Sequence, residues 1–180
     1  MEVAVGRRTG FDFARFVFYN ELMELRKVSL VLLIREGEVL LAMKKRRFGA
    51  GRWNGVGGKP EPGETVEQSA ERESEEEIGV KFGLNDLEHV ASLRFYFPEH
   101  KKDWNQEVPV YLVRKWEGEP IETEEVRPQW FKYADIPYAE MWPDDKYWLP
   151  RILAGEKLEG EFYFADEGDS FERYELREMV

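Results

Sequence analysis

The stretch GKPEPGETVEQSAERESEEEIGV occupies positions 58–80 and joins a turn rich in glycine and proline to a segment crowded with acids. The pattern predicts a turn over 58–63 and a helix from about Thr65 to Ile78, with Thr65 as its N-cap and Gly79 as its end. Within that helix Glu73, Glu76 and Glu77 stand at positions i, i+3 and i+4, so they share one face.

This crowding of acids has two interpretations. Like charges at helical spacing destabilise a helix by roughly 0.2–0.5 kcal/mol per pair, and these acids also lie near the negative end of the helix dipole. A solvated acidic surface explains one such pair well, but it explains poorly a cluster behind Gly57, Gly58 and Gly63. A hard divalent cation removes the conflict, because Mg²⁺ binds carboxylate oxygens and bridges them to substrate phosphates. We therefore favour a metal site.

Composition restricts the possible functions. The chain has 180 residues, enough for one domain with a core, and a net charge of −11 from 37 acidic and 26 basic residues. Such a surface disfavours nucleic acid polymers and anionic membranes, whereas a nucleotide can still bind through a metal and local Lys or Arg. The absence of cysteine excludes disulfides and thiolate zinc sites. No apolar run reaches the roughly 18 residues of a membrane span, and no signal peptide is visible. We expect a cytoplasmic, monomeric protein.

The pattern of strands and helices favours one α/β (α+β) sandwich with a mixed central sheet. We expect strands over 28–34, 39–43, 53–57, 87–97, 108–116 and 127–133, a polar loop over 98–107, and a closing hairpin from 162–164 and 171–176. A second helix should run to about Leu153, capped by Asp144 or Asp145. We expect residues 1–25 to be an N-terminal extension before a domain at 26–180. A short helix near 11–18 is either a docking helix or lies outside the fold proper.

The spacing of positions 58–80 resembles the signature of the Nudix hydrolases. The matching positions are Gly58, Glu64, Arg72, Glu73, Glu76, Glu77, Gly79 and Val80. Ser74 departs from this pattern, which has an apolar residue there. Blocks outside the signature are similar to the MutT-homologue subfamily, so that the resemblance covers roughly 26–178. These blocks are Lys44–Arg46, Phe48–Gly55, Gly57–Lys59, Arg127-Pro128, Trp130-Phe131, Met141–Asp145 and Tyr147-Trp148.

The resemblance implies a Nudix-type α/β/α sandwich whose loop-helix-loop carries the catalytic groups. It implies catalysis by Glu73, Glu76 and Glu77, with Arg72 holding Glu64, and Mg²⁺ (or Mn²⁺) as cofactor. The implied metal ligands are Glu73, Glu76, Glu77, Glu125 and the backbone carbonyl of Gly57. By spacing alone, Glu125 is a loop charge.

The resemblance also implies a pocket for the base, lined by Ser29, Phe48, Asn54, Phe95, Trp142, Asp144 and Asp145, with Lys44 near its mouth. From the residues alone, Trp142 is a core residue or a flat stacking surface, and Asn54 is a turn residue or a reader of a base edge. Asp144 and Asp145 are a helix cap with a surface acid, or a buried pair of which one stays protonated.

The function implied by the resemblance is Mg-dependent hydrolysis of oxidised purine nucleoside triphosphates to monophosphate and pyrophosphate, which sanitises the nucleotide pool. The substrates would be of the 8-oxo-dGTP and 2-hydroxy-dATP type. Two alternatives remain open. One is a Nudix hydrolase of another nucleoside diphosphate derivative, such as a dinucleoside polyphosphate or ADP-ribose, and the other is a nucleotide-binding module without turnover.

Overall fold

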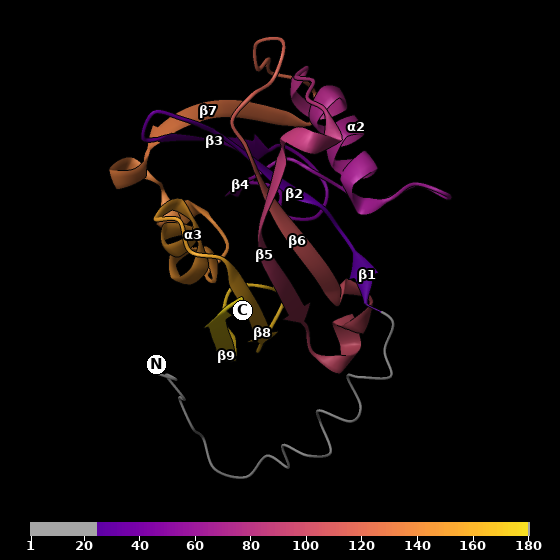
Figure 1. The fold of residues 1–180 in the computed structure, drawn as a ribbon. Helices are drawn as coiled ribbons and strands as arrows, with labels where there is room; N and C mark the ends of the chain where they lie inside the picture. Colours follow the sequence, from indigo (N-terminus) through magenta and orange to yellow (C-terminus); the bar gives the residue numbers. More distant parts are fainter. Residues whose placement is uncertain (1–24, 180) are drawn as a thin grey trace.

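A computed structural model describes residues 25–179, which form a mixed sheet with two α-helices (Figure 1). The strands are β1 (Arg26–Lys27), β2 (Leu30–Arg35), β3 (Glu38–Lys44), β4 (Trp53–Asn54), β5 (Leu87–Tyr96), β6 (Gln106–Val113), β7 (Val126–Lys132), β8 (Leu158–Phe164) and β9 (Phe171–Glu178). The helices are α2 (Val66–Ile78) and α3 (Asp145–Leu153), and short 3₁₀ turns cover Leu84–Asp86, Glu99–Trp104, Tyr133–Asp135 and Tyr138–Glu140.

The sheet combines parallel and antiparallel pairs. Its order is β4-β3-β2-β6-β5-β8-β9, with β1 paired to β6 and β7 paired to β3. The pairs β1–β6, β2–β6 and β5–β8 are parallel, and the others are antiparallel. The pairing of β3 with β7 brings Lys44 opposite Val126, so the cations after β3 lie beside the segment that carries Glu125.

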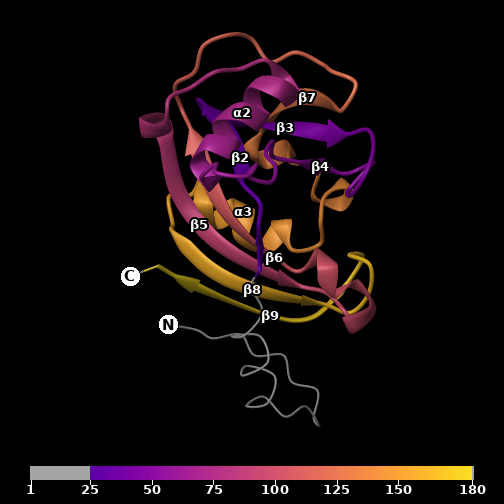
Figure 2. The same ribbon diagram turned by 90° about the vertical axis from the view of Figure 1, so that its right-hand side faces the viewer.

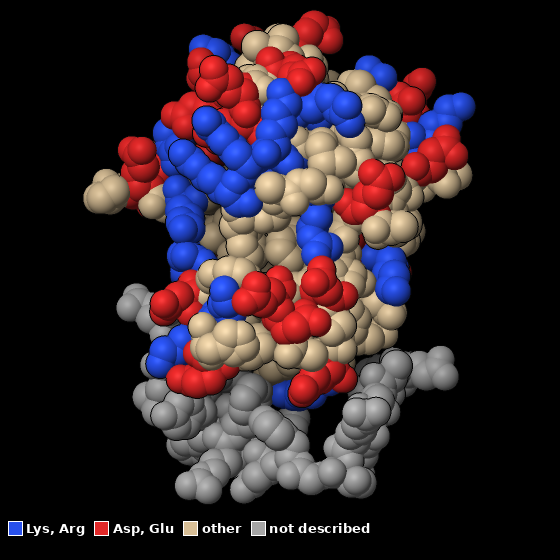
Figure 3. Space-filling model, turned by 180° about the vertical axis from the view of Figure 1, so that it is seen from behind, with Lys and Arg blue, Asp and Glu red and all other residues tan. Residues whose placement is uncertain are grey.

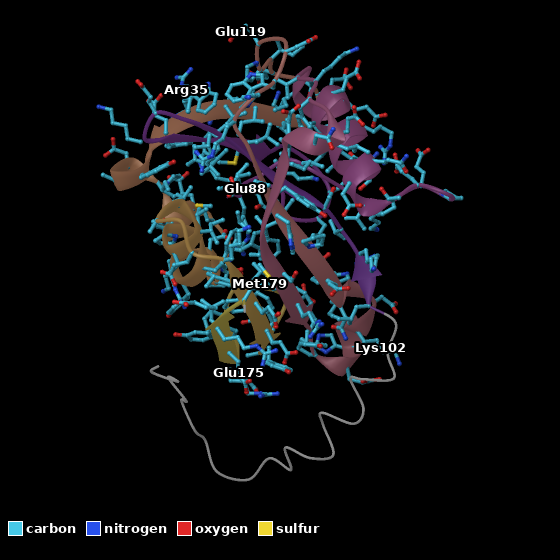
Figure 4. All side chains as sticks on the ribbon, viewed as in Figure 1. Arg35, Glu88, Lys102, Glu119, Glu175 and Met179 are labelled. Carbon is cyan, nitrogen blue, oxygen red and sulfur yellow. The ribbon has the colours of Figure 1, made fainter. Side chains whose placement is uncertain are left out.

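Alternation along β2 separates two apolar cores. Leu32 and Ile34 pack with residues of α3, whereas Val31 and Leu33 pack with residues of α2. Because successive side chains of a strand point to opposite faces, the two helices cover opposite faces of the sheet. Figures 1 and 2 show this layering, and Figure 4 shows side chains filling the space between α3 and the sheet. The predicted α/β/α sandwich is confirmed.

Local chemistry fixes both ends of α2. Thr65 Oγ1 accepts from the Gln68 backbone N–H and the Gln68 side chain accepts from the Thr65 N–H, which forms a capping box. Gly79 ends the helix in the left-handed conformation, with φ of 74°. Ser74, the departure from the signature, is fully buried, and its hydroxyl donates to the Ala70 carbonyl at 2.7 Å. The polar side chain is therefore satisfied within the helix.

Several predicted boundaries were wrong. The strand expected over 53–57 is limited to Trp53–Asn54, with a separate bridge at Val56. The loop at 98–107 contains a 3₁₀ turn, and it is closed by Asn105 Oδ1 accepting from the Phe97 N–H at 2.7 Å. β6 starts at Gln106 and ends at Val113, before the predicted end, and the closing hairpin is longer than predicted.

The helix predicted near 11–18 lies outside the described residues. None of the helices within residues 25–179 is both long and apolar enough to cross a membrane.

Candidate active site

Glu77 is the buried member of the acid cluster on α2. Only 5% of its surface is exposed, its Oε2 accepts from the Gly57 N–H at 3.1 Å, and the Lys44 ammonium lies 3.7 Å from Oε1. Burial raises the pKa of Glu77, and the charges of Glu73 and Glu125 raise it further, while Lys44 and the Gly57 N–H lower it. Within the described residues, Lys44 is the one cation at ion-pair distance from Glu77.

Glycines let the turn at 57–58 approach α2 closely. A Cβ at Gly58 would collide with the Glu73 carboxylate, and one at Gly57, whose φ is 144°, would collide with the Ser29 carbonyl. Within residues 25–179 no hydrogen bond is donated to the Gly57 carbonyl oxygen. The Gly57 carbonyl oxygen is therefore free to bind a cation. The N–H of the same residue donates to the Glu77 carboxylate, so both oxygens belong to one site.

Arg72 holds three of the acids together. Its Nε and Nη2 donate to Glu64 at 3.0 Å each, and its Nη1 donates to Glu73 at 2.9 Å and Glu76 at 3.2 Å. Nη2 also donates to the Lys59 carbonyl at 3.1 Å. The Glu64 pairing, expected from the resemblance, ties the turn to the helix.

Glu125 lies against cations of the loop that follows β3. Arg46 Nη2 is 2.6 Å from Glu125 Oε1, and Arg47 Nη1 is 3.9 Å from the same oxygen. The hydrogen bond from Arg46 lowers the pKa of Glu125, with further lowering by the nearby charges. Because the Glu125 charge also raises the pKa of Glu77, the two carboxylates act on each other electrostatically.

The donor set fits a hard divalent cation, since it consists of carboxylates and a free backbone carbonyl. In the described part of the chain, no three such side chains stand close enough together to hold a metal as they are arranged. Arg72, Arg46 and Lys44 hold the acids instead. Metal binding would therefore require some carboxylates to exchange these partners for the cation.

All eight predicted substrate residues line one cavity of about 140 Å³, together with Gly57 and Glu77. The substrate residues are Ser29, Lys44, Phe48, Asn54, Phe95, Trp142, Asp144 and Asp145. The same cavity is thus lined by the aromatic ring of Trp142 and by the buried carboxylate of Glu77. A larger cavity between β8, β9 and α3 contains none of these residues.

Trp142 stands between aromatic and cationic neighbours. Phe48 stacks on it at a centroid distance of 5.1 Å, and the Arg52 guanidinium lies 4.5 Å from its ring centroid. Phe48 is 43% exposed and also packs edge-on against Trp104 at 4.9 Å and Phe97 at 6.3 Å, so another flat ring on this face of Trp142 would have to displace it. This arrangement suits a stacking site.

Asp144 and Asp145 are both buried, each 2% exposed. Trp148 Nε1 donates to Asp144 Oδ2 at 2.9 Å, and the Trp142 N–H donates to Asp145 Oδ2 at 3.0 Å. Burial raises the pKa of Asp144 to about 6, and burial with the Asp144 charge raises the pKa of Asp145 well above its ordinary value. Asp144 stands at the N-cap of α3, as the sequence predicted for Asp144 or Asp145, but its side chain accepts no capping hydrogen bond from a helix N–H.

Two other predicted residues are partly engaged by the protein. The Ser29 hydroxyl lies 3.2 Å from Ser69 Oγ and from both the N–H and the carbonyl of Gly58. Asn54 Oδ1 accepts from the Gly55 N–H, which leaves its amide N–H groups for a ligand. Ser29 thus shapes the pocket wall, while Asn54 presents donors to the cavity.

Comparisons with known proteins agree with this geometry. The sequence profile of the NUDIX domain matches residues 23–152. The chain belongs to the Nudix family of hydrolases. It is 45% identical over 157 residues to the oxidized purine nucleoside triphosphate hydrolase of Mus musculus, covering 86% of this chain and 96% of the mouse protein. It is 43% identical over 137 residues to the protein of the same name from Danio rerio, covering 76% and 85%.

Solved structures give the same family. The MutT protein of Bacillus halodurans superposes on this Nudix chain with a TM-score of 0.70 at 27% identity, covering 84% of this chain and 97% of that one. The MutT Nudix hydrolase of Burkholderia pseudomallei superposes with a TM-score of 0.53 at 31% identity, covering 64% and 88%.

Sequence reasoning missed some residues of this Nudix pocket. Gln106 lines the cavity, and within residues 25–179 its side-chain amide makes no hydrogen bond. Its position on the cavity face could have been found from the alternation of Gln106, Val108 and Val110, but the polar run before it indicated a loop. The ion pairs Lys44–Glu77 and Arg46–Glu125 were also missed, because they depend on long-range strand pairing.

Proposed function

We propose that this Nudix hydrolase cleaves oxidised purine nucleoside triphosphates, of the 8-oxo-dGTP and 2-hydroxy-dATP type, to a monophosphate and pyrophosphate. The observation that carries the proposal is the single cavity that joins Trp142 and the buried Asp144–Asp145 pair to Glu77. The names of the mouse and zebrafish relatives support the same substrate class. We expect the enzyme to act as a monomer on free nucleotides.

The aromatic end of the cavity recognises the base. Trp142 stacks on the purine ring after Phe48 gives way, and the Asn54 amide N–H groups donate to an acceptor on the base edge. An ionised carboxylate of the aspartate pair accepts from ring N–H and amino groups, as a guanine-type edge presents. A protonated carboxyl donates to an unprotonated ring nitrogen, as an adenine-type edge presents. Exchange of one proton between the two acids therefore allows both kinds of base.

The other end of the cavity carries out the hydrolysis. Glu73, Glu76, Glu77, Glu125 and the Gly57 carbonyl would hold Mg²⁺ or Mn²⁺, which when bound neutralises phosphate charge and lowers the pKa of water. Glu77, the buried acid of the cluster, which also lines the cavity, receives the proton of the attacking water. Water attacks phosphorus, the phosphoanhydride bond breaks, and pyrophosphate separates from the monophosphate. Arg72 keeps Glu64 and the turn in place against α2.

A substrate screen tests this function. Pyrophosphate and monophosphate release would be measured with Mg²⁺ or Mn²⁺ for 8-oxo-dGTP, 2-hydroxy-dATP, dGTP, dATP, ADP-ribose and a dinucleoside polyphosphate. We expect release from the two oxidised purines at a kcat/KM at least about tenfold above that for the ordinary ones, a preference worth about 1.4 kcal/mol. A preference for ADP-ribose or the dinucleoside polyphosphate, or binding without turnover, would contradict the proposal.

A further inference from the structure

Arg47 has an unusual backbone. Among positions 25–179 it is the one non-glycine residue with positive φ, at 65°. A side chain with a Cβ disfavours this left-handed conformation, whereas glycine adopts it freely. The residue lies in a turn between β3 and β4, where the Arg47 carbonyl accepts from the Ala50 N–H at 3.1 Å and the Lys44 carbonyl accepts from the Gly51 N–H at 2.8 Å.

The turn explains the backbone conformation of Arg47, but it does not explain why an arginine stands at this position. The turn places Phe48 on Trp142, and a Cβ on Gly49 would lie 3.3 Å from Trp142 Cζ2. A glycine at position 47 would form the same turn with less strain. Non-glycine residues in such conformations are concentrated at ligand-binding and active sites, where the side chain has a use that offsets the cost.

The arginine side chain is available for a ligand. It is 73% exposed, and its one ion pair within the described residues is the 3.9 Å contact with Glu125 Oε1, an oxygen that Arg46 already contacts at 2.6 Å. The contact of Arg47 is too long for a hydrogen bond, so the guanidinium can turn toward another anion. Figure 3 shows a large group of Lys and Arg side chains on the face opposite that of Figure 1.

The position of Arg47 identifies the anion. It is adjacent in the chain to Phe48, which lines the cavity, and it contacts Glu125, whose charge acts on Glu77. Arg47 is not itself among the residues that line the cavity, but its guanidinium lies 3.9 Å from Glu125, one of the carboxylates that would hold the metal. A nucleotide bound with its base on Trp142 and its phosphates toward Glu77 carries its polyphosphate past this guanidinium, which forms paired hydrogen bonds to phosphate oxygens.

We propose that Arg47 binds the polyphosphate of the substrate and thereby favours nucleoside triphosphates over monophosphate products. The inference rests on the proposed function for the orientation of the nucleotide. Arg47 is a positioning residue that holds the leaving polyphosphate without taking part in the transfer of protons. Its effect is expected in substrate affinity and KM, with little effect on kcat.

The experiment compares the full chain with Arg47→Gly, which removes the cation and relaxes the backbone, and with Arg47→Lys, which keeps the charge. Arg114→Ala is the matched control, because Arg114 is 59% exposed and, within the described residues, its single carboxylate neighbour is Glu88 at 3.5 Å, which is not one of the acids of the site. Thermal unfolding gives Tm. Calorimetry gives the affinity for inorganic tripolyphosphate and for the purine monophosphate, and kinetics give KM and kcat for 8-oxo-dGTP.

We expect Arg47→Gly to raise Tm by about 2 °C, since glycine relieves the left-handed strain. The same variant should weaken tripolyphosphate binding and raise KM by about fivefold, with kcat and monophosphate affinity changed less than about twofold. Arg47→Lys should retain about half of the affinity. The difference between Arg47→Gly and the unsubstituted chain should shrink at about 0.5 M salt, because exposed charges are screened.

A rise in Tm with unchanged tripolyphosphate affinity and KM would show that Arg47 is only a turn residue and would overturn the inference. An equal loss in Arg114→Ala would overturn it too, by showing a general effect of net charge. If the unsubstituted chain releases no pyrophosphate from oxidised purines, the proposed function fails. The tripolyphosphate measurement still decides the role of Arg47 in that case, because it involves no base.

Discussion

The acids of α2 and the acid pair at the start of α3 both bring negative charges close together, but their surroundings differ. Arg72 donates to Glu64, Glu73 and Glu76, and the acids it holds are at least partly open to water. Asp144 and Asp145 are buried, and within residues 25–179 no arginine donates a hydrogen bond to either; their hydrogen-bond partners are an indole N–H and a backbone N–H, while Arg52 acts on both only through its charge.

These different surroundings suit the carboxylates to two different roles, metal binding for the acids held by Arg72 and hydrogen bonding that depends on protonation for the buried pair. An acid held by a cation stays ionised, so it can exchange that cation for a metal ion at little cost in protonation. A buried acid with neutral partners takes up a proton instead, so it can donate as well as accept a hydrogen bond. Glu77 combines both situations, because it is buried but has Lys44 nearby. The predictions below test this division, from the largest expected effect to the smallest.

Removing the charge of Glu77 should have the largest effect. Glu77→Gln keeps an acceptor for the Gly57 N–H but loses a metal ligand and the base, so we expect kcat for pyrophosphate release to fall by about 10³-fold or more. Glu75→Gln is the control, since Glu75 is on the same helix, 52% exposed and paired with Lys81. Full activity in Glu77→Gln, or an equal loss in Glu75→Gln, would refute the assignment.

Changing one member of the buried pair should alter selectivity. In Asp144→Asn the amide oxygen can still accept from Trp148 Nε1, but the pair can no longer exchange a proton. We expect the preference for 8-oxo-dGTP over dGTP, measured as a ratio of kcat/KM, to change by about 100-fold. Asp135→Asn, on a turn outside the cavity, should leave the ratio unchanged. An unaltered ratio in Asp144→Asn would mean that the base does not bind here.

Replacing Arg72 by lysine tests the ion-paired acids. An ammonium cannot meet Glu64, Glu73 and the Lys59 carbonyl at once, so Arg72→Lys should lower kcat/KM about tenfold and unfolding free energy by about 1 kcal/mol. Arg177→Lys is the matched control, because Arg177 also donates twice to one carboxylate, Glu159, but is 78% exposed. Equal losses of stability in both variants would show that the Arg72 network has no special role.

The sequence was most informative where chemistry is local. The cap at Thr65 and the end at Gly79 depend on neighbouring residues, and both are observed. The sequence predicted Asp144 or Asp145 as the cap of α3; Asp144 does stand at the N-cap, but its carboxylate accepts from the Trp148 indole, a contact that depends on the burial of both residues. Gln106 was assigned to a loop because the pattern of one strand did not reveal its pairing with Phe95. The roles of the site residues remain predictions: metal binding by the glutamates of α2 came from their spacing, and the roles of Glu125 and the residues of the base pocket came from the resemblance.

The smallest expected effect is on the pH dependence of stability, which should differ between the acids held by Arg72 and the buried pair Asp144–Asp145. The folded pKa of Asp144, about 6, exceeds its ordinary value of 3.8, so the stability associated with this group is full below pH about 4 and is lost as pH rises through about 6. Arg72 lowers the pKa of Glu64, so the contribution of Glu64 runs the other way and is lost only as pH falls below the ordinary range for glutamate.

Asp144→Asn removes the first dependence and leaves the second. The advantage of Asp144→Asn over the unsubstituted chain in unfolding free energy should therefore grow by about 1 kcal/mol between pH 5 and pH 8, or about 2–4 °C in Tm. Denaturant titrations at several pH values measure it, with Asp135→Asn as the control for loss of a surface acid. A difference that stays constant with pH would mean that Asp144 is ionised throughout, and the proton exchange proposed for base recognition would then have no donor on Asp144.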